Sequence, residues 1–242
     1  MLVYSNSCSF GSPTDHKIYP EEIASNLNAT LINAGQPSSC NRRIIRTSLR
    51  DLLKLSNTNQ NNILALIGLT FLSRTELWQP WLPADNNDGD FHSIQVDYQK
   101  LDWSKGLDSK IPNIHNYADI RVSDYYKHWL LHYNPEAEIC NLLTDLILFC
   151  GWCKTNNIKY LIFCNTDMFP DVDFNTVFLS SLIRTINDDP NILNPWKFSF
   201  GTYALSKNHV PKDFKIYGKH GHPNEQAHID FAQHLLLKYI NV

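Results

Sequence analysis

The sequence lacks the features that mark several large classes of protein. Its 242 residues carry 21 Lys and Arg against 24 Asp and Glu, and this net charge of −3 provides no basic surplus for nucleic acid or an anionic membrane. No apolar run approaches the ~20 residues of a membrane-spanning helix. Polar residues follow the first apolar ones at once, unlike a secretory signal. We therefore expect a cytoplasmic protein with neither nucleic acid nor membrane as a partner.

The cysteines lack the density and the spacing of a disulfide framework. The six cysteines are Cys8, Cys40, Cys140, Cys150, Cys153 and Cys164. Cys150 and Cys153 form a CxxC pair, but no second pair accompanies them to complete a zinc site. Buried, reduced thiols are the simpler interpretation, and a redox or metal role for this pair is the alternative.

What the chain does contain is a core and an alternating order of elements. Hydrophobic residues make up 43% and aromatic residues 12%, which argues against disorder. The patterns predict strands at 2–5, 30–33, 63–67 and 159–164, with a weaker one at 198–203. They predict helices near 20–27, 41–55, 124–131, 137–155, 174–186 and 223–239.

This strand–helix alternation predicts an α/β fold, a three-layer α/β/α sandwich with a mostly parallel central sheet of flavodoxin-like type. We expect one domain over residues 1–242. The stretch at about 79–112 is rich in Asp, Asn, Pro and Trp, so we expect it to be a long loop insertion.

Four polar segments are predicted to meet at one edge of this sheet, because ligands of open parallel sheets bind at the carboxyl ends of the strands. Three of them follow predicted strands, at 5–11, 33–41 and 68–76. The fourth contains His222, which stands immediately before Pro223 at the expected start of the last helix. A histidine held at the entry to a docked helix is well placed to move a proton.

The residues of these loops could support acyl transfer. Ser9 is the candidate nucleophile, although Ser and Gly are also common in turns for backbone reasons. Asn41 and Thr70 are candidate donors to an oxyanion, and Asn41 has the alternative role of a helix N-cap. Arg74 and Glu76 could contact a substrate or pair with each other.

The polar segments contain four short blocks, which are SNSCSFG, NAGQPSSCN, IGLTFLSRTELW and GHPNEQAH. These blocks resemble those of the SGNH/GDSL hydrolases, in a variant of bacterial or phage type that reads Gly-Cys-Ser-Phe in its first block. Each is permissive by itself. They occur in the family's order between Ser7 and His228, which makes the resemblance fairly specific.

The resemblance implies that Ser9 is the nucleophile and His222 the general base. It also implies an oxyanion hole that includes the backbone N–H groups of Ser9 and Ser38, with Thr70 where the wider family has Asn. The expected function is a serine esterase that removes a short acyl group, such as O-acetyl, from a glycan or small-molecule ester. No cofactor and no metal are expected.

The sequence also departs from the family pattern. Ser7 and Ser38 replace glycines, and Lys219 and His220 stand where an Asp normally orients the histidine. A neighbouring cation would lower the pKa of His222, the opposite of what a carboxylate does. A backbone carbonyl could orient His222 in a dyad, or the site could be weak and kept for binding. The remaining option is a distant carboxylate, from Asp213, Asp167 or Asp171.

The sequence also allows three other interpretations of the function. A catalytically weak binding protein for a carbohydrate or protein partner could use the tryptophans Trp78, Trp81 and Trp103. A metal site could use the histidines His16, His220, His222 and His228. A Cys8 nucleophile is the third, although its side chain is expected to face away from that of Ser9.

Overall fold

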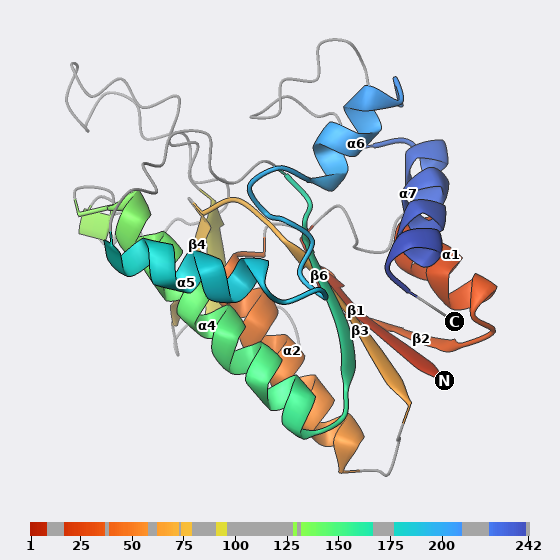
Figure 1. Cartoon of the computed structure of the whole chain (residues 1–242), viewed down its shortest axis with the longest axis horizontal. Helices are drawn as coiled ribbons and strands as arrows, with labels where there is room; N and C mark the ends of the chain where they lie inside the picture. Colours follow the sequence, from red (N-terminus) through yellow and green to blue (C-terminus); the bar gives the residue numbers. More distant parts are fainter. Residues whose placement is uncertain are drawn as a thin grey trace.

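Figure 1 shows the protein as a computed structural model. The residues that the structure describes are 1–8, 17–36, 39–57, 62–72, 128–129, 132–166, 177–209 and 223–240. Residues 74–78 and 91–95 are described as backbone only.

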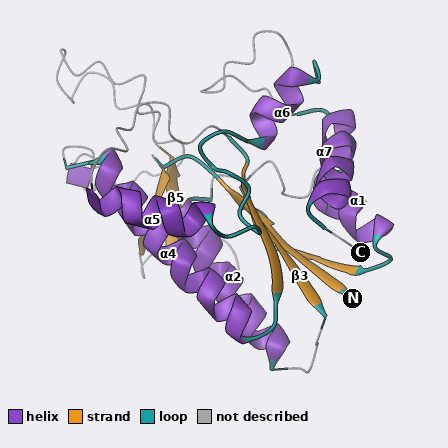
Figure 2. Ribbon diagram, in the orientation of Figure 1, coloured by secondary structure: helices purple, strands orange, loops and turns teal. Residues whose placement is uncertain are grey.

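The central sheet has four parallel strands in the order β2-β1-β3-β6 (Figure 2). The strands are β1 (Leu2–Ser7), β2 (Thr30–Asn33), β3 (Ile63–Leu69) and β6 (Lys159–Cys164). The predicted bounds of β2 and β6 are confirmed, and β1 and β3 are both longer than predicted at their carboxyl ends. Sequence patterns miss these extensions because Asn, Ser and Gly are weak strand formers, yet Ser7 is paired with Gly68 inside the sheet.

Helices cover both faces of the sheet, which confirms the predicted three-layer α/β/α arrangement (Figure 1). On one face lie α1 (Tyr19–Asn26), α6 (Phe200–Ser206) and α7 (Glu225–Lys238). On the other lie α2 (Asn41–Ser56), α4 (Pro135–Thr155) and α5 (Val177–Asn187). Because successive strand residues point to opposite faces, neighbours such as Val3 and Tyr4 belong to separate buried clusters, one under each layer of helices.

Local sequence explains where several helices end. Asn28, Asn157 and Asn208 follow the C-caps of α1, α4 and α6 with φ of 48°, 55° and 57°. Asparagine tolerates this left-handed conformation better than most residues, so it ends a helix much as glycine does. At the other end of α4, the Asn134 side chain accepts from the N–H groups of Glu136 and Ala137.

The weak strand predicted at 198–203 is wrong, because α6 begins at Phe200. Ser199 caps this helix, and its side chain and that of Thr202 bond each other's backbone N–H groups as a capping box. Residues before the helix pair with the sheet through their backbone. Ile162 of β6 bonds to Asn191 and Leu193, and Ser199 forms an isolated parallel bridge with Cys164.

A small antiparallel hairpin interrupts the stretch expected to be loop. Its strands are β4 (Arg74–Trp78) and β5 (Phe91–Gln95). The loop prediction for 79–112 is therefore wrong over 91–95, and its other residues lie outside the described ones. The helix predicted at 124–131 also lies largely outside them, with residues 128 and 129 helical.

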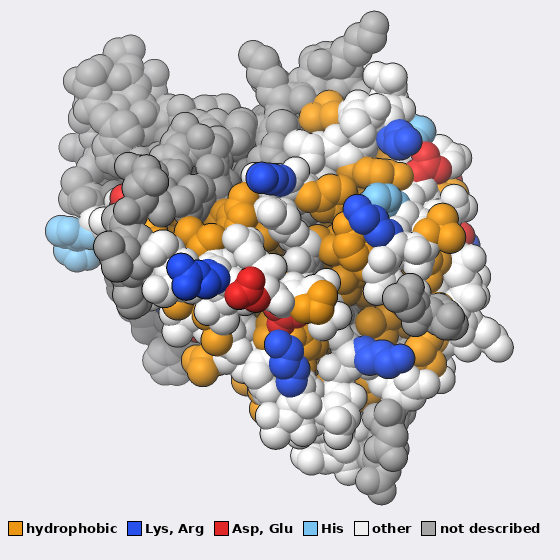
Figure 3. Space-filling model, viewed as in Figure 1, with side chains coloured by type: hydrophobic (Ala, Val, Ile, Leu, Met, Phe, Trp, Pro, Cys, Tyr) orange, Lys and Arg blue, Asp and Glu red, His pale blue; other side chains and the backbone are white. Residues whose placement is uncertain are grey.

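In Figure 3 the Lys and Arg side chains lie apart from one another on the visible face. Within the described ranges, no helix combines the length and apolar character needed to cross a bilayer.

Candidate functional site

The sheet changes winding direction between β1 and β3, at the edge where the polar blocks were expected to meet. From β1 the chain moves outward to β2 and then returns to the opposite side of β1 to form β3. In parallel sheets, ligands bind outside the carboxyl ends of the two strands at such a switch point. The last pair of residues across it is Ser7 and Gly68, and Ser9 follows two positions later.

The predicted site residues fall into three groups. Asn41 and Thr70 are described with their side chains, and both are buried. Arg74 and Glu76 are placed by their backbone in β4, opposite Gln95 and Ser93. The residues that lie outside the described ranges are Ser9, Ser38 and His222, together with Lys219, His220, Asp213, Asp167 and Asp171.

The second polar block is bonded directly to the first. The Gln36 N–H donates to the Ser7 carbonyl oxygen at 3.0 Å. The buried Arg43 guanidinium then holds the loop from the first turn of α2, donating to Gln36 Oε1 at 2.6 Å and to Ser39 Oγ at 2.8 Å. These bonds fix the residues on both sides of Pro37 and Ser38 beside the end of β1.

The third block is bonded to the second through a two-point clamp. Asn41 Oδ1 accepts from the Thr70 N–H at 2.7 Å, and Asn41 Nδ2 donates to the Thr70 carbonyl at 2.9 Å. The alternative that Asn41 caps α2 is wrong, because the cap is Cys40, whose sulfur accepts from the Arg43 N–H. Thr70 Oγ1 is buried and has no partner among the described residues, so its hydroxyl can donate to a group placed beside it.

Gly68 makes room for a side chain from a third strand. A Cβ added there would lie 2.9 Å from Ser7 Cβ and 2.6 Å from Asn165 Nδ2, both closer than real contacts allow. Asn165 follows β6 and is fully buried, and its Nδ2 lies 3.7 Å from Cys8 Sγ. Ser7 itself lies in β1 and is not among the described residues with positive φ, so serine at the position of the glycine in the SGNH/GDSL pattern costs no backbone strain.

The fourth block reaches the first through Tyr19. The Tyr19 N–H donates to His228 Nδ1 at 3.3 Å, and the two rings stack with centroids 5.9 Å apart. Since Nδ1 accepts, the neutral ring carries its proton on Nε2. Burial raises the pKa of the Tyr19 hydroxyl above its ordinary value, although the Ser7 and Ser5 hydroxyls beside it oppose the shift.

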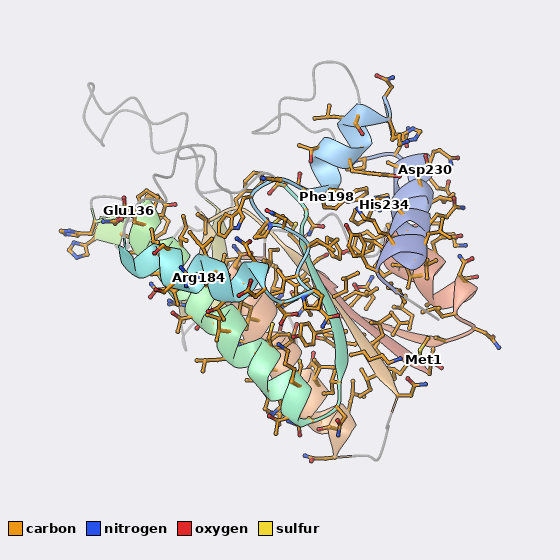
Figure 4. All side chains as sticks on the ribbon, viewed as in Figure 1. Met1, Glu136, Arg184, Phe198, Asp230 and His234 are labelled. Atoms are coloured by element: carbon orange, nitrogen blue, oxygen red, sulfur yellow. The ribbon has the colours of Figure 1, made fainter. Side chains whose placement is uncertain are left out.

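The described residues that flank the segment containing His222 are bonded to each other and to α7. Helix α7 begins at Glu225 with Asn224 as its cap, so the expectation that Pro223 is its first residue is wrong. The Asn224 N–H donates to the His209 carbonyl at 3.4 Å, and the His209 ring lies 2.7 Å from Asp230 Oδ2. Figure 4 shows Asp230 on α7, and His234 of the same helix stacks on Phe198 with centroids 5.7 Å apart.

The described thiols bear on the redox and Cys8 alternatives, whereas His16, His220 and His222 of the metal alternative lie outside the described residues. Burial raises the pKa of both Cys150 and Cys153 to about 12, which suits inert thiols better than redox-active ones. Cys8 is fully buried. Within the described part of the chain, no group of three His, Cys, Asp or Glu side chains could hold a metal ion.

Three features have little or no signal in the sequence. Arg43 shares with Arg42, Arg46 and Arg50 a spacing that predicts the exposed face of a helix, yet its side chain is buried, and no motif includes Asn165. One signal was available for Asn165, since it directly follows an apolar strand as Thr70 does. The contact between Tyr19 and His228 joins residues 209 positions apart and has no local signature.

Two solved structures are similar in overall outline. The psychrotrophic esterase EstA from Pseudoalteromonas sp. has a TM-score of 0.49 and 12% identity over 100% of this chain and 99% of its own. A protein described as an acylhydrolase from Bacteroides fragilis NCTC 9343 has a TM-score of 0.41 and 14% identity over 99% of this chain and 86% of its own. At these TM-scores and identities neither structure bears on the site, which rests on this chain's own residues.

No curated protein matches the sequence. One family model does match, over residues 8–241. The match includes β2, β3 and β6 and three polar blocks in full, and it includes the first block from Cys8 onward, while β1 precedes it. The chain therefore belongs to the family of unknown function DUF6071.

Proposed function

We propose that the protein is a serine acyl hydrolase of SGNH type, with Ser9 as nucleophile and His222 as general base. The observation that carries the proposal is that the blocks of this hydrolase pattern are bonded to one another at the switch point of the sheet. Gln36 bonds to Ser7, Asn41 bonds to Thr70, and Ser7 is paired with Gly68. His228, the last residue of the fourth block, accepts a hydrogen bond from the N–H of Tyr19, whose hydroxyl lies beside those of Ser5 and Ser7.

In the proposed reaction, Ser9 Oγ attacks the ester carbonyl while His222 accepts its proton. The tetrahedral intermediate collapses, His222 returns the proton to the leaving alcohol, and an acyl-serine remains. Water, deprotonated by His222, then attacks the acyl-serine and releases the acid. One acyl group is thus transferred to water in two steps and the enzyme is regenerated.

The oxyanion of the intermediate requires donors that are fixed before the reaction begins. We assign this role to the N–H groups of Ser9 and Ser38 and to the Thr70 hydroxyl. The contacts of Arg43 with Gln36 and Ser39 and the clamp on Thr70 support it, because they fix the neighbours of the donors. Asn41 then acts by positioning Thr70.

Either a backbone carbonyl or a carboxylate from Asp213, Asp167 or Asp171 is proposed to orient His222. Asp230 is a poor candidate, because its oxygens already lie 2.7 Å from Gln226 Nε2 and from His209 Nε2. The substrate is proposed to be a short-chain ester, such as an O-acetyl group on a glycan or small molecule. Arg74 and Glu76 are proposed to contact its alcohol portion.

The test is hydrolysis of p-nitrophenyl acetate and butyrate, together with fluorophosphonate labelling. Ser9→Ala and His222→Ala should abolish hydrolysis, and Ser9→Ala should also abolish labelling. Matched controls are Ser206→Ala and His132→Ala, which alter exposed residues of the same types and should retain full activity. Hydrolysis that survives both site substitutions would contradict the proposal.

A second series identifies the group that orients His222. Asp213→Asn, Asp167→Asn and Asp171→Asn are each compared with wild type at saturating substrate. If one of them is the acidic member, its variant should lose about 10⁴ in turnover, as in a triad protease. If a backbone carbonyl has this role, none of the three should lose more than a few-fold.

A further inference from the structure

Asn165 lies at the carboxyl ends of three neighbouring strands of the sheet, β1, β3 and β6. Its backbone follows β6, and its side-chain amide lies over Gly68 of β3, close to Ser7 at the end of β1. An added Cβ on Gly68 would lie 2.6 Å from Asn165 Nδ2 and 3.0 Å from Asn165 Oδ1. The missing side chain of Gly68 therefore creates the space that the amide fills.

The backbone of Asn165 is held on both sides. Its N–H donates to the Leu69 carbonyl at 2.8 Å, and its carbonyl accepts from the Gly201 N–H at 2.9 Å. The first bond ties it to β3 and the second to the start of α6. A side chain that projects from a backbone fixed in this way is itself well fixed, and Asn165 has no exposed surface.

From this position the amide reaches Cys8, the residue immediately before Ser9. Asn165 Nδ2 lies 3.7 Å from Cys8 Sγ, and both side chains are fully buried. The contact holds for either orientation of the amide, since a thiol can donate a weak hydrogen bond or accept one. As placed, Asn165 Oδ1 has no partner among the described residues.

A buried amide with an unpaired oxygen is a poor choice for stability alone. Such a group costs about 1–3 kcal/mol when it is left unsatisfied, and an apolar side chain of similar size avoids that cost. Buried polar groups of this kind are typical of functional sites, where local stability is given up for geometry. The amide's one described side-chain hydrogen bond is to the residue that precedes the candidate nucleophile.

We propose that Asn165 is a positioning residue of this site, whose amide, seated on Gly68, holds Cys8 and so fixes where the Ser9 hydroxyl stands. The inference rests on the proposed function, because it gives Asn165 its role through Ser9. Without the amide, Cys8 loses its contact with the residue that follows β6, and the chain that leads into Ser9 has one fewer contact to hold it. A misplacement of about 1 Å at a reacting group can cost on the order of 100-fold in rate.

The experiment perturbs this contact from three sides. Asn165→Ala removes the amide, Cys8→Ala removes the sulfur, and Gly68→Ala keeps both partners but crowds the amide and the Ser7 side chain with an added Cβ. The matched glycine control is Gly151→Ala in α4, where an added Cβ meets nothing within 4 Å. Circular dichroism and thermal unfolding show which variants retain the wild-type fold.

The measurements are kcat and KM for p-nitrophenyl acetate, their pH dependence, and the rate of fluorophosphonate labelling at Ser9. Each of the three variants should lower kcat and the labelling rate by about 10- to 100-fold, the range expected for a displaced nucleophile. KM and the apparent pKa of the kcat profile should stay as in wild type, because the base is untouched. Gly151→Ala should leave every value unchanged.

The double variant Cys8→Ala/Asn165→Ala separates positioning from a general effect on the fold. If Asn165 acts through Cys8, the double variant should be no slower than the slower single variant. Multiplied losses would overturn the proposal, as would wild-type labelling rates in a folded Asn165→Ala or Cys8→Ala protein. If Asn165→Ala does not fold, Cys8→Ala decides alone. If wild type itself shows no labelling at Ser9, the proposed function fails first.

Discussion

Replacing Asn41 with alanine should destabilise the protein more than any other single substitution at the start of α2. The Asn41 side chain makes two hydrogen bonds to the backbone of Thr70, at 2.7 and 2.9 Å, and both residues are buried. Alanine would leave the N–H and the carbonyl of Thr70 without these partners. Each buried, unsatisfied group costs about 1–3 kcal/mol, so the expected loss is about 2–6 kcal/mol.

This loss is large beside a total stability of about 5–15 kcal/mol. The assay is equilibrium unfolding in guanidinium chloride at pH 7, supported by thermal unfolding, where each kcal/mol corresponds to about 2–4 °C in a protein of this size. Asn41→Asp should lose at least as much as Asn41→Ala. It keeps an oxygen for the Thr70 N–H, but it buries a carboxylate whose second oxygen faces the Thr70 carbonyl oxygen in place of a donor.

The matched control is Arg42→Ala, one residue further along the same helix on its exposed face. An exposed substitution of this kind should change the free energy of unfolding by no more than about 0.5 kcal/mol. If Asn41→Ala costs no more than Arg42→Ala, the clamp does not hold Thr70, and the reasoning that joins the second and third blocks is refuted.

Three further predictions concern other parts of the structure. Arg43→Lys keeps the charge but cannot bond Gln36 and Ser39 together as the guanidinium fork does. The kcat for p-nitrophenyl acetate should therefore fall about 10-fold, a moderate loss of positioning. An unchanged kcat would count against the role of Arg43. Hydrogen bonds from Gln226 and His209 lower the pKa of Asp230, so its contribution to stability is present above its ordinary pKa of about 3.9 and is lost as the pH falls through the lower folded value. Asp230→Asn should therefore unfold with a weaker dependence on pH in acid than wild type does, and parallel denaturation midpoints across that range would contradict this. Since burial raises the pKa of Cys150 and Cys153 to about 12, iodoacetamide at pH 8 should modify them only after unfolding, as mass spectrometry of peptides from native and denatured protein can show.

The strands and helices were largely predictable because their signals are local. Apolar runs at β2 and β6 gave the correct bounds, and the asparagines at the ends of α1, α4 and α6 are residues that commonly occupy such positions. The failures occurred where local and tertiary preferences differ. Aromatic and β-branched residues near Phe200 indicated a strand, but the capping box of Ser199 and Thr202 starts a helix there. The hairpin of β4 and β5 joins segments separated by a polar stretch, which hides it from local patterns.

The sequence by itself determined the α/β class, the order of the polar blocks and the choice of Ser9 and His222 as candidates, because periodicity and motif spacing are properties of the chain alone. Only the tertiary structure decided which residues hold the blocks together. Asn41 reaches Thr70, Arg43 reaches Gln36, and Asn165 reaches Cys8 across Gly68. The physical reason is that these contacts depend on strand order and on the space left beside one glycine. The folded sheet sets both the strand order and this space, and neither can be recognised from a periodic pattern of residues in the sequence.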